Sequence, residues 1–146
     1  MSKSKWFIGI LLLSLICIPF VACTSPSQEA WVEVSCDEFY DNHNINTTLE
    51  VQAGETFDVK LCSNPSTGFQ WSKDSQISDT TVLKQENHEF VGLESEPPPP
   101  PGTPGQEIWS FKALKQGSST IHLEYSRPWE SGEKGEWTLT IDVIVK

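Results

Sequence analysis

Hydrophobic and polar residues alternate one by one in several short runs of this chain. In the clearest run, Phe57, Val59 and Leu61 are separated by polar residues. An alternation with a period of two is typical of strands that bury one face. The pattern occurs over residues 31–34, 57–62, 109–113, 121–125 and 139–145.

The segments between these runs carry turn residues and no helical signal. Glycine marks turns within residues 53–55, 115–118 and 131–135. After Ser25, no apolar stripe with a helical period is longer than two turns. A length of 146 residues suggests one domain. Many short strands in one domain predict an all-β fold, either an antiparallel sandwich or a barrel.

The first 22 residues have the layout of a secretory signal peptide. Lys3 and Lys5 precede an apolar run over residues 6–21, which is shorter than the ~20 residues that a membrane span needs. The sequence Phe20-Val21-Ala22-Cys23 resembles a bacterial lipoprotein signal, which implies cleavage before Cys23 and lipidation of its thiol. Residues 23–30 would then form a flexible tether, and the protein is expected to be extracytoplasmic, either membrane-anchored or secreted. An uncleaved membrane anchor is the alternative.

The chain is strongly acidic, with a formal net charge of −10. Loss of the signal removes two lysines and makes the remainder still more acidic. This charge argues against binding to nucleic acid, and against binding to anionic membranes by charge alone. Contact with a membrane is therefore expected only through a lipid anchor.

The remaining cysteines and histidines do not predict a catalytic or metal site. Cys36 and Cys62 could form one disulfide in an oxidising compartment, or remain as two buried thiols. His43, His88 and His122 are scattered without metal-ligand spacing, so neither a metal nor a cofactor is expected. No nucleophile-elbow, zinc-protease or phosphate-loop pattern occurs in the sequence. An enzyme is therefore not predicted.

Three separated turn-rich segments lie between strand-like runs. They are Asn64-Pro65-Ser66-Thr67-Gly68-Phe69, Gly102-Thr103-Pro104-Gly105 and Arg127-Pro128-Trp129. Taken singly, each is compatible with a plain turn, since Asn, Pro and Gly all favour turns. Taken in this order, they resemble the three loops of the chagasin family of inhibitors of papain-like cysteine proteases. The resemblance covers residues 31–146.

The resemblance implies an immunoglobulin-like antiparallel β-sandwich of seven or eight strands. It also implies a reversible, non-covalent inhibitor that uses these three segments to bind a papain-like cysteine protease, and a monomer suits that role. Thr67 would lie nearest the catalytic centre, and Trp129 would pack beside the cleft. Ser66 stands where the family often has threonine. The alternative is a non-inhibitory immunoglobulin-like lipoprotein module for binding or adhesion, in which any turn sequence would serve.

A run of five prolines, Pro97 to Pro101, precedes the second segment. Such a run favours the polyproline II conformation and excludes a central strand. It could be a spacer, a ligand for a proline-binding domain, or a stiff arm that carries Gly102 to Gly105 away from the sandwich. The match of this second segment to the family is the loosest of the three.

Overall fold

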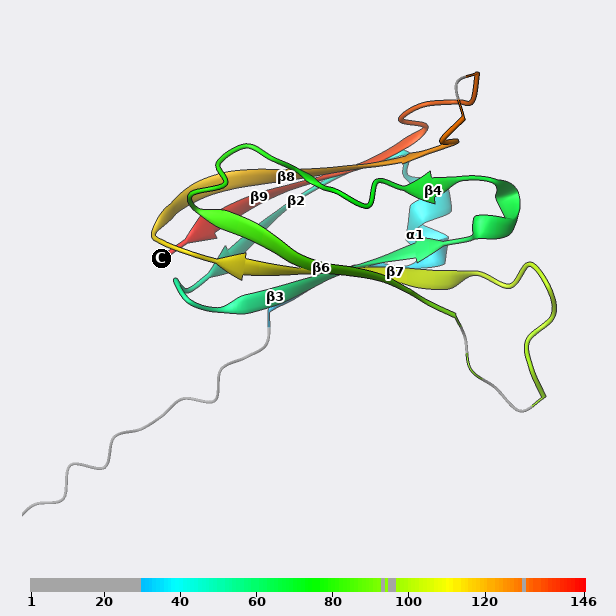
Figure 1. The fold of residues 1–146 in the computed structure, drawn as a ribbon, viewed down its shortest axis with the longest axis horizontal. Helices are drawn as coiled ribbons and strands as arrows, with labels where there is room; N and C mark the ends of the chain where they lie inside the picture. The colour runs from blue at the N-terminus through cyan, green and yellow to red at the C-terminus, as the bar shows by residue number, and fades with distance from the viewer. Residues whose placement is uncertain (1–29, 93, 95–96, 130) are drawn as a thin grey trace, which may run out of the picture.

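A computed structural model describes residues 30–92, 94, 97–129 and 131–146. Its strands form two layers that pack face to face (Figure 1). The elements are β1 (Trp31–Val34), α1 (Cys36–Asp41), β2 (Asn44–Val51), β3 (Thr56–Ser63), the 3₁₀ helix η1 (Pro65–Thr67), β4 (Gln70–Trp71), β5 (Gln76–Ile77), β6 (Leu83–Val91), β7 (Gly105–Ala113), β8 (Gly117–Ser126) and β9 (Trp137–Val145). The predicted all-β, immunoglobulin-like sandwich is confirmed.

The two sheets are mixed rather than purely antiparallel. One has the order β1-β3-β7-β6 and the other β2-β9-β8-β4, with β5 paired to β8. β1 pairs with β3 in parallel, as does β2 with β9, and the remaining pairs are antiparallel. Parallel partners need long crossover connections, and alternation within a strand does not reveal which neighbour it takes. The described residues form nine strands, two of them only two residues long, against seven or eight predicted.

The core follows from the alternation seen in the sequence. Along β7, Glu107, Trp109, Phe111 and Ala113 are all buried, whereas the residues between them are partly exposed. Trp109 packs edge to face against Trp71 on β4 of the opposite sheet, with ring centroids 6.3 Å apart. Burying a large apolar side chain contributes about 1.5–3 kcal/mol to folding. The two inner faces therefore hold the sheets together.

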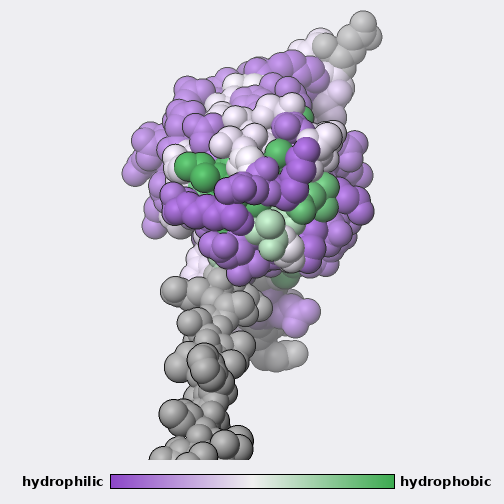
Figure 2. Space-filling view, turned by 90° about the vertical axis from the view of Figure 1, so that its left-hand side faces the viewer, coloured by the Kyte–Doolittle hydropathy of each residue, from purple (hydrophilic) through white to green (hydrophobic). Residues whose placement is uncertain are grey.

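The chain enters the sandwich from the end at which β3 begins. β1 runs parallel to β3, with Trp31 opposite Asp58 and Val34 opposite Leu61. Figure 2 shows this end, at which the C-terminus also lies, as mostly hydrophilic with small, separate hydrophobic patches. The segments singled out in the sequence all lie at the other end (Figure 1).

The predicted signal peptide (1–22), the lipidation of Cys23 and most of the tether (23–30) lie outside the described residues. Among the residues that are described, no helix is both long and apolar enough to span a membrane.

Candidate functional site

Three connections meet at the end of the sandwich drawn on the right of Figure 1. Loop 1 (residues 64–69) follows β3 and contains η1. Loop 2 (residues 97–104) leads into β7. Loop 3 (residues 127–129 and 131–136) connects β8 to β9. These loops contain the three segments singled out in the sequence, apart from Gly105, which is the first residue of β7.

Loop 1 is a closed turn built by its own side chains. The Asn64 carboxamide oxygen accepts hydrogen bonds from the Ser66 amide (3.2 Å) and hydroxyl (2.6 Å). The Thr67 hydroxyl donates to the Asn64 carbonyl (2.7 Å) and accepts from the Phe69 amide (3.3 Å). Gly68 closes the turn with φ = 81°, in the left-handed region that favours glycine. The sequence Asn-Pro-Ser-Thr-Gly therefore specifies this conformation locally.

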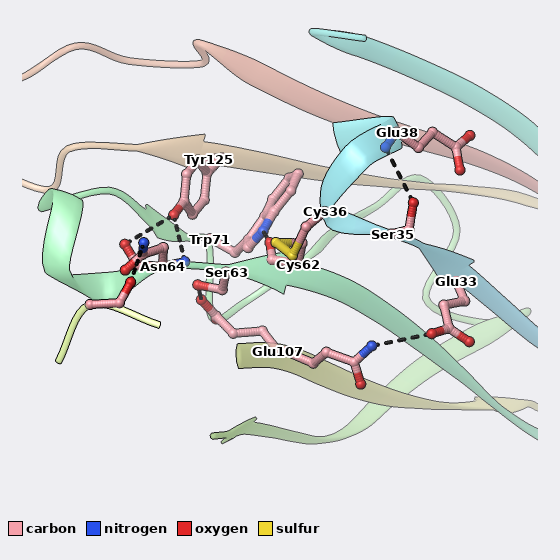
Figure 3. Close-up of a disulfide and its surroundings, with 12 residues drawn as sticks. Glu33, Ser35, Cys36, Glu38, Cys62, Ser63, Asn64, Trp71, Glu107 and Tyr125 are labelled. Carbon is pink, nitrogen blue, oxygen red and sulfur yellow. Dashed lines mark hydrogen bonds between the residues drawn. A yellow bond between two sulfur atoms is a disulfide. The ribbon is translucent and has the colours of Figure 1, made fainter. Parts of the chain in front are cut away.

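Buried aromatic side chains support loop 1 on the side that faces the core, and Figure 3 shows Tyr125 and Trp71 among them. The Tyr125 hydroxyl accepts a hydrogen bond from the Asn64 amide (3.0 Å), and the Phe69 ring stacks on Tyr125 with centroids 5.5 Å apart. The Trp71 indole donates to the carbonyl of Cys62 (2.9 Å), two residues before the loop begins. Cys62 is joined by a disulfide to Cys36 on α1, so these residues are not free thiols.

Loop 2 is held against loop 1 by a side chain of loop 1. The Asn64 amide group donates to the Gly102 carbonyl (3.0 Å). Gly102 has φ = 87°, and the Thr103 hydroxyl and amide both donate to the Pro100 carbonyl, at 2.7 and 3.2 Å. The tip of loop 2 is therefore a tight turn in a fixed place beside Ser66.

Loop 3 is held against the other side of loop 1 by an aromatic–cation stack. The Arg127 guanidinium lies 4.5 Å from the centroid of the Phe69 ring and 5.7 Å from that of Trp129. Arg127 also pairs with Glu133 at 2.7 Å. The Lys134 ammonium donates to the carbonyls of Arg127 and of Trp129, the latter at 2.8 Å. Trp129 thus stands beside loop 1 with 48% of its surface exposed.

The structure brings together every segment that the sequence singled out, but two residues within them face inward. Phe69 is buried under loop 1, and Gly105 is buried in β7 beneath the ring of Phe90. They shape the surface rather than present it. Pro65, Ser66 and Thr67 are exposed, as are Gly102, Pro128 and Trp129, while Asn64, Gly68, Thr103, Pro104 and Arg127 are partly exposed.

This surface is suited to binding a partner rather than to catalysis. The described residues of loops 1 and 2 carry no ionisable side chain, and the Thr67 hydroxyl is engaged within its own turn. Across the described ranges, no cluster of three or more His, Cys, Asp or Glu side chains is placed to hold a metal ion. The sequence did not indicate Lys134, because its ammonium acts on the Arg127 and Trp129 carbonyls, which only the fold brings within its reach.

Comparison with known proteins agrees with the three-loop arrangement. The model of the chagasin family of peptidase inhibitors, I42, matches residues 50–143, a range that contains all three loops. The chain belongs to the chagasin family. Among its relatives is amoebiasin-2 of Entamoeba histolytica, which is 34% identical over 101 residues, covering 69% of this chain and 79% of the relative. Since family members are peptidase inhibitors, this chain is an inhibitor and not an enzyme.

Two solved structures share the architecture of this chagasin-family chain. The cysteine protease inhibitor EhICP2 of Entamoeba histolytica has a TM-score of 0.58 and 25% identity, covering 80% of this chain and 97% of its own. PbICP-C, solved in complex with falcipain-2, also has a TM-score of 0.58, at 19% identity, covering 80% and 98%. Because the identity to PbICP-C is only 19%, this second similarity is evidence for a shared fold alone.

Proposed function

We propose that this chain inhibits papain-like cysteine proteases reversibly and without covalent chemistry, by inserting loops 1, 2 and 3 as a wedge into the active-site cleft. The observation that carries this proposal is the position of loop 1. It contacts loop 2 through Asn64 and Gly102, and loop 3 through Gly68 and Trp129. Three segments far apart in the sequence therefore form one continuous surface with an uncharged centre.

In this arrangement loop 1 blocks the catalytic cysteine, with Thr67 at its tip, while loops 2 and 3 contact the walls of the cleft. Hydrogen bonds within and between the loops fix their conformation before binding, which lowers the entropy lost on association. Trp129 is a half-exposed indole next to Arg127, and these residue types are enriched at binding hot spots.

The same rigidity accounts for an inhibitor that is not itself cleaved. A protease processes a substrate segment in an extended conformation, whereas residues 65–67 form a 3₁₀ turn. The turn is closed by the Asn64, Ser66 and Thr67 hydrogen bonds and anchored by the Tyr125 hydroxyl. Opening it would disrupt these bonds together.

The inhibitor domain, residues 31–146, would act as a monomer on the outside of the cell. Residues 1–22 would direct export, Cys23 would carry a lipid, and residues 23–30 would form a tether of about 15 Å root-mean-square length. β1 enters from the end away from the loops, so such an anchor would leave the wedge facing outward. Labelling cells with a lipid precursor tests this, because Cys23→Ser should abolish incorporation into the protein.

The inhibitory function is tested by titrating papain with purified residues 24–146 and reading residual activity on a fluorogenic peptide. Stoichiometric loss of activity with the inhibitor recovered intact is expected. A folded sample that inhibits none of several papain-like enzymes at micromolar concentration would overturn the proposal. Cleavage of the sample during the titration would contradict the wedge mechanism.

A further inference from the structure

Phe90, near the end of β6, is a large apolar residue on the inner face of its sheet that the opposite sheet leaves uncovered. It pairs across the ladder with Glu107, and His88 pairs with Trp109. Paired residues of antiparallel strands project to the same face. Glu107 and Trp109 are buried, so Phe90 also belongs to the inner face, yet 47% of its surface is exposed.

Two features of the fold produce this exposure. Before the bulge between Gln85 and Asn87, the odd-numbered residues of β6 face inward. After the bulge the even-numbered residues His88 and Phe90 face inward. In the facing sheet, β4 is only two residues long, Gln70–Trp71. The inner face of β6 therefore extends beyond its cover.

An open groove of about 290 Å³ occupies this gap. Its lining includes Pro65 from loop 1, Trp71 from β4, and His88, Phe90 and Glu107 from the other sheet. The volume equals that of roughly ten water molecules in the liquid. This volume is just below the range of pockets that hold drug-sized ligands, which is about 300–1,000 Å³. The groove is therefore of a size to take one or two side chains.

Two of the three ionisable residues that line the groove, Glu107 and His88, are paired with each other, and the third is Lys73. The buried Glu107 carboxylate accepts a hydrogen bond from the Ser63 hydroxyl (2.7 Å), as Figure 3 shows, and its second oxygen lies 2.7 Å from His88 Nε2. The His88 ring in turn packs on Trp109, with centroids 4.7 Å apart. A basic occupant would find the Glu107 carboxylate already engaged, and Lys73 is the one lining residue that could pair with an acidic occupant. The rings of Phe90 and Trp71 and the Pro65 ring favour an apolar one.

Gly105 fixes the position of the Phe90 ring. A Cβ atom at Gly105 would lie 2.5 Å from the Val91 carbonyl oxygen and 2.7 Å from Phe90 Cζ. The ring can lie over the first residue of β7 only because that residue has no side chain. Phe90 is thus placed at the base of loop 2, with Pro65 of loop 1 across the groove.

We propose that this groove is an additional binding site on the inhibitor, which takes a bulky apolar side chain from the rim of the target protease's cleft. The inference rests on the proposed function. The groove lies between loop 1 and the base of loop 2, so a partner that encloses both loops must also cover it. The same protease therefore supplies the occupant, and Phe90 helps determine which proteases are bound tightly.

The test compares Phe90→Ala with the matched control Leu114→Ala. Leu114 is similarly exposed, at 45%, but follows the far end of β7. Inhibition constants and dissociation rates are measured with residues 24–146 against several papain-like proteases. Phe90→Ala should weaken inhibition about tenfold on at least one of them, mainly through faster dissociation, and Leu114→Ala should have no effect. Phe90→Leu should show an intermediate loss.

The outcomes separate this proposal from the proposed function. If wild-type protein inhibits and Phe90→Ala inhibits equally well on every protease, the groove is not a binding site, although the wedge stands. If wild-type protein inhibits none of them, the proposed function fails and the groove proposal falls with it. Equal losses in Phe90→Ala and Leu114→Ala would show a general effect on the domain and would also overturn the inference. Thermal unfolding of each variant verifies that the fold is retained.

Discussion

The indole ring of Trp129 lies directly over the backbone of Gly68. A Cβ atom at Gly68 would be 2.8 Å from Cη2 of the indole, closer than real Cβ contacts, and 3.3 Å from Cζ3, which is tighter than most of them. Gly68 also has φ = 81°, a left-handed conformation that costs other residues about 1–2 kcal/mol. Gly68 thus allows the left-handed turn of loop 1, and because it has no side chain it leaves room for the Trp129 ring of loop 3.

Gly68→Ala should therefore weaken inhibition at least tenfold, because the added methyl displaces Trp129 as well as straining the turn. Gly54→Ala is the matched control. Its φ is 89°, but no atom lies within 4 Å of a Cβ built there. The control should lose about 1–2 kcal/mol of stability and leave the inhibition constant unchanged. Equal inhibition constants for the two variants would mean that the contact with Trp129 does not matter for binding.

Strands could be predicted where apolar and polar residues alternate over at least part of the strand, as they do in β1, β3, β7, β8 and β9. The predicted runs 109–113, 121–125 and 139–145 are the parts of β7, β8 and β9 in which every second residue is apolar and buried. β6 escaped prediction because its bulge breaks the pattern, placing Leu83 and Gln85 in one phase and His88 and Phe90 in the other. β2 escaped because it lies at the edge of its sheet, where Ile45 and Leu49 are only partly covered.

The site was predictable where local chemistry determines it. Asn64, Pro65 and Gly68 build a turn almost unaided, so loop 1 can be identified in the sequence. Contacts between loops depend on long-range folding, and nothing local to Lys134 indicates that its ammonium meets the Trp129 carbonyl. The parallel pairing of β1 with β3 is hidden for the same reason.

Thr67→Glu should weaken inhibition by more than a hundredfold. It would place a longer, charged side chain at the tip of loop 1, where burial of an unpaired charge costs several kcal/mol. It would also remove the hydroxyl that bonds to Asn64 and Phe69. Thr67→Val separates these effects, since it loses the hydroxyl without adding length or charge, and should cost much less. Inhibition constants for the two variants decide the point, and equal values would place Thr67 outside the cleft.

Removing the disulfide should lower the stability of the domain. Cys36 and Cys62 are 26 residues apart in sequence, and closing a loop of that length contributes about 3.5 kcal/mol in the chain-entropy model. The double variant Cys36→Ala, Cys62→Ala should unfold at a lower urea concentration than the wild type. Reduced wild-type protein should resemble the variant. Identical midpoints for oxidised and reduced wild type would show that the cross-link adds no stability.

Asp79 should titrate below the ordinary carboxyl range. Hydrogen bonds from the Thr81 hydroxyl (2.6 Å) and then from its amide (2.8 Å) hold the pKa of Asp79 below its ordinary value of 3.8. A depressed folded-state pKa contributes stability above the unfolded-state pKa, and that contribution is lost as pH falls through the folded value. Thr81→Ala should raise the pKa of Asp79. The variant should be less stable than the wild type near neutral pH, and this difference in the free energy of unfolding should shrink below about pH 4. Carboxyl NMR titration of both proteins measures this, and unchanged curves would contradict the role of Thr81.

Lys134→Met should weaken inhibition severalfold. Trp129→Ala should lose about 2 kcal/mol of binding free energy if Trp129 is a hot spot, and the loss in Lys134→Met should not exceed that. The ammonium donates to the carbonyls of Arg127 and Trp129, whereas methionine keeps the aliphatic stem and removes these bonds. Lys84→Met is the control, since Lys84 lies 3.8 Å from Glu86 in an exposed pair of little energetic value. Faster dissociation of Lys134→Met alone, at unchanged thermal stability, would establish that Lys134 positions Trp129. Binding equal to wild type would show that Arg127 alone positions Trp129, through its contacts with the two rings and its pairing with Glu133.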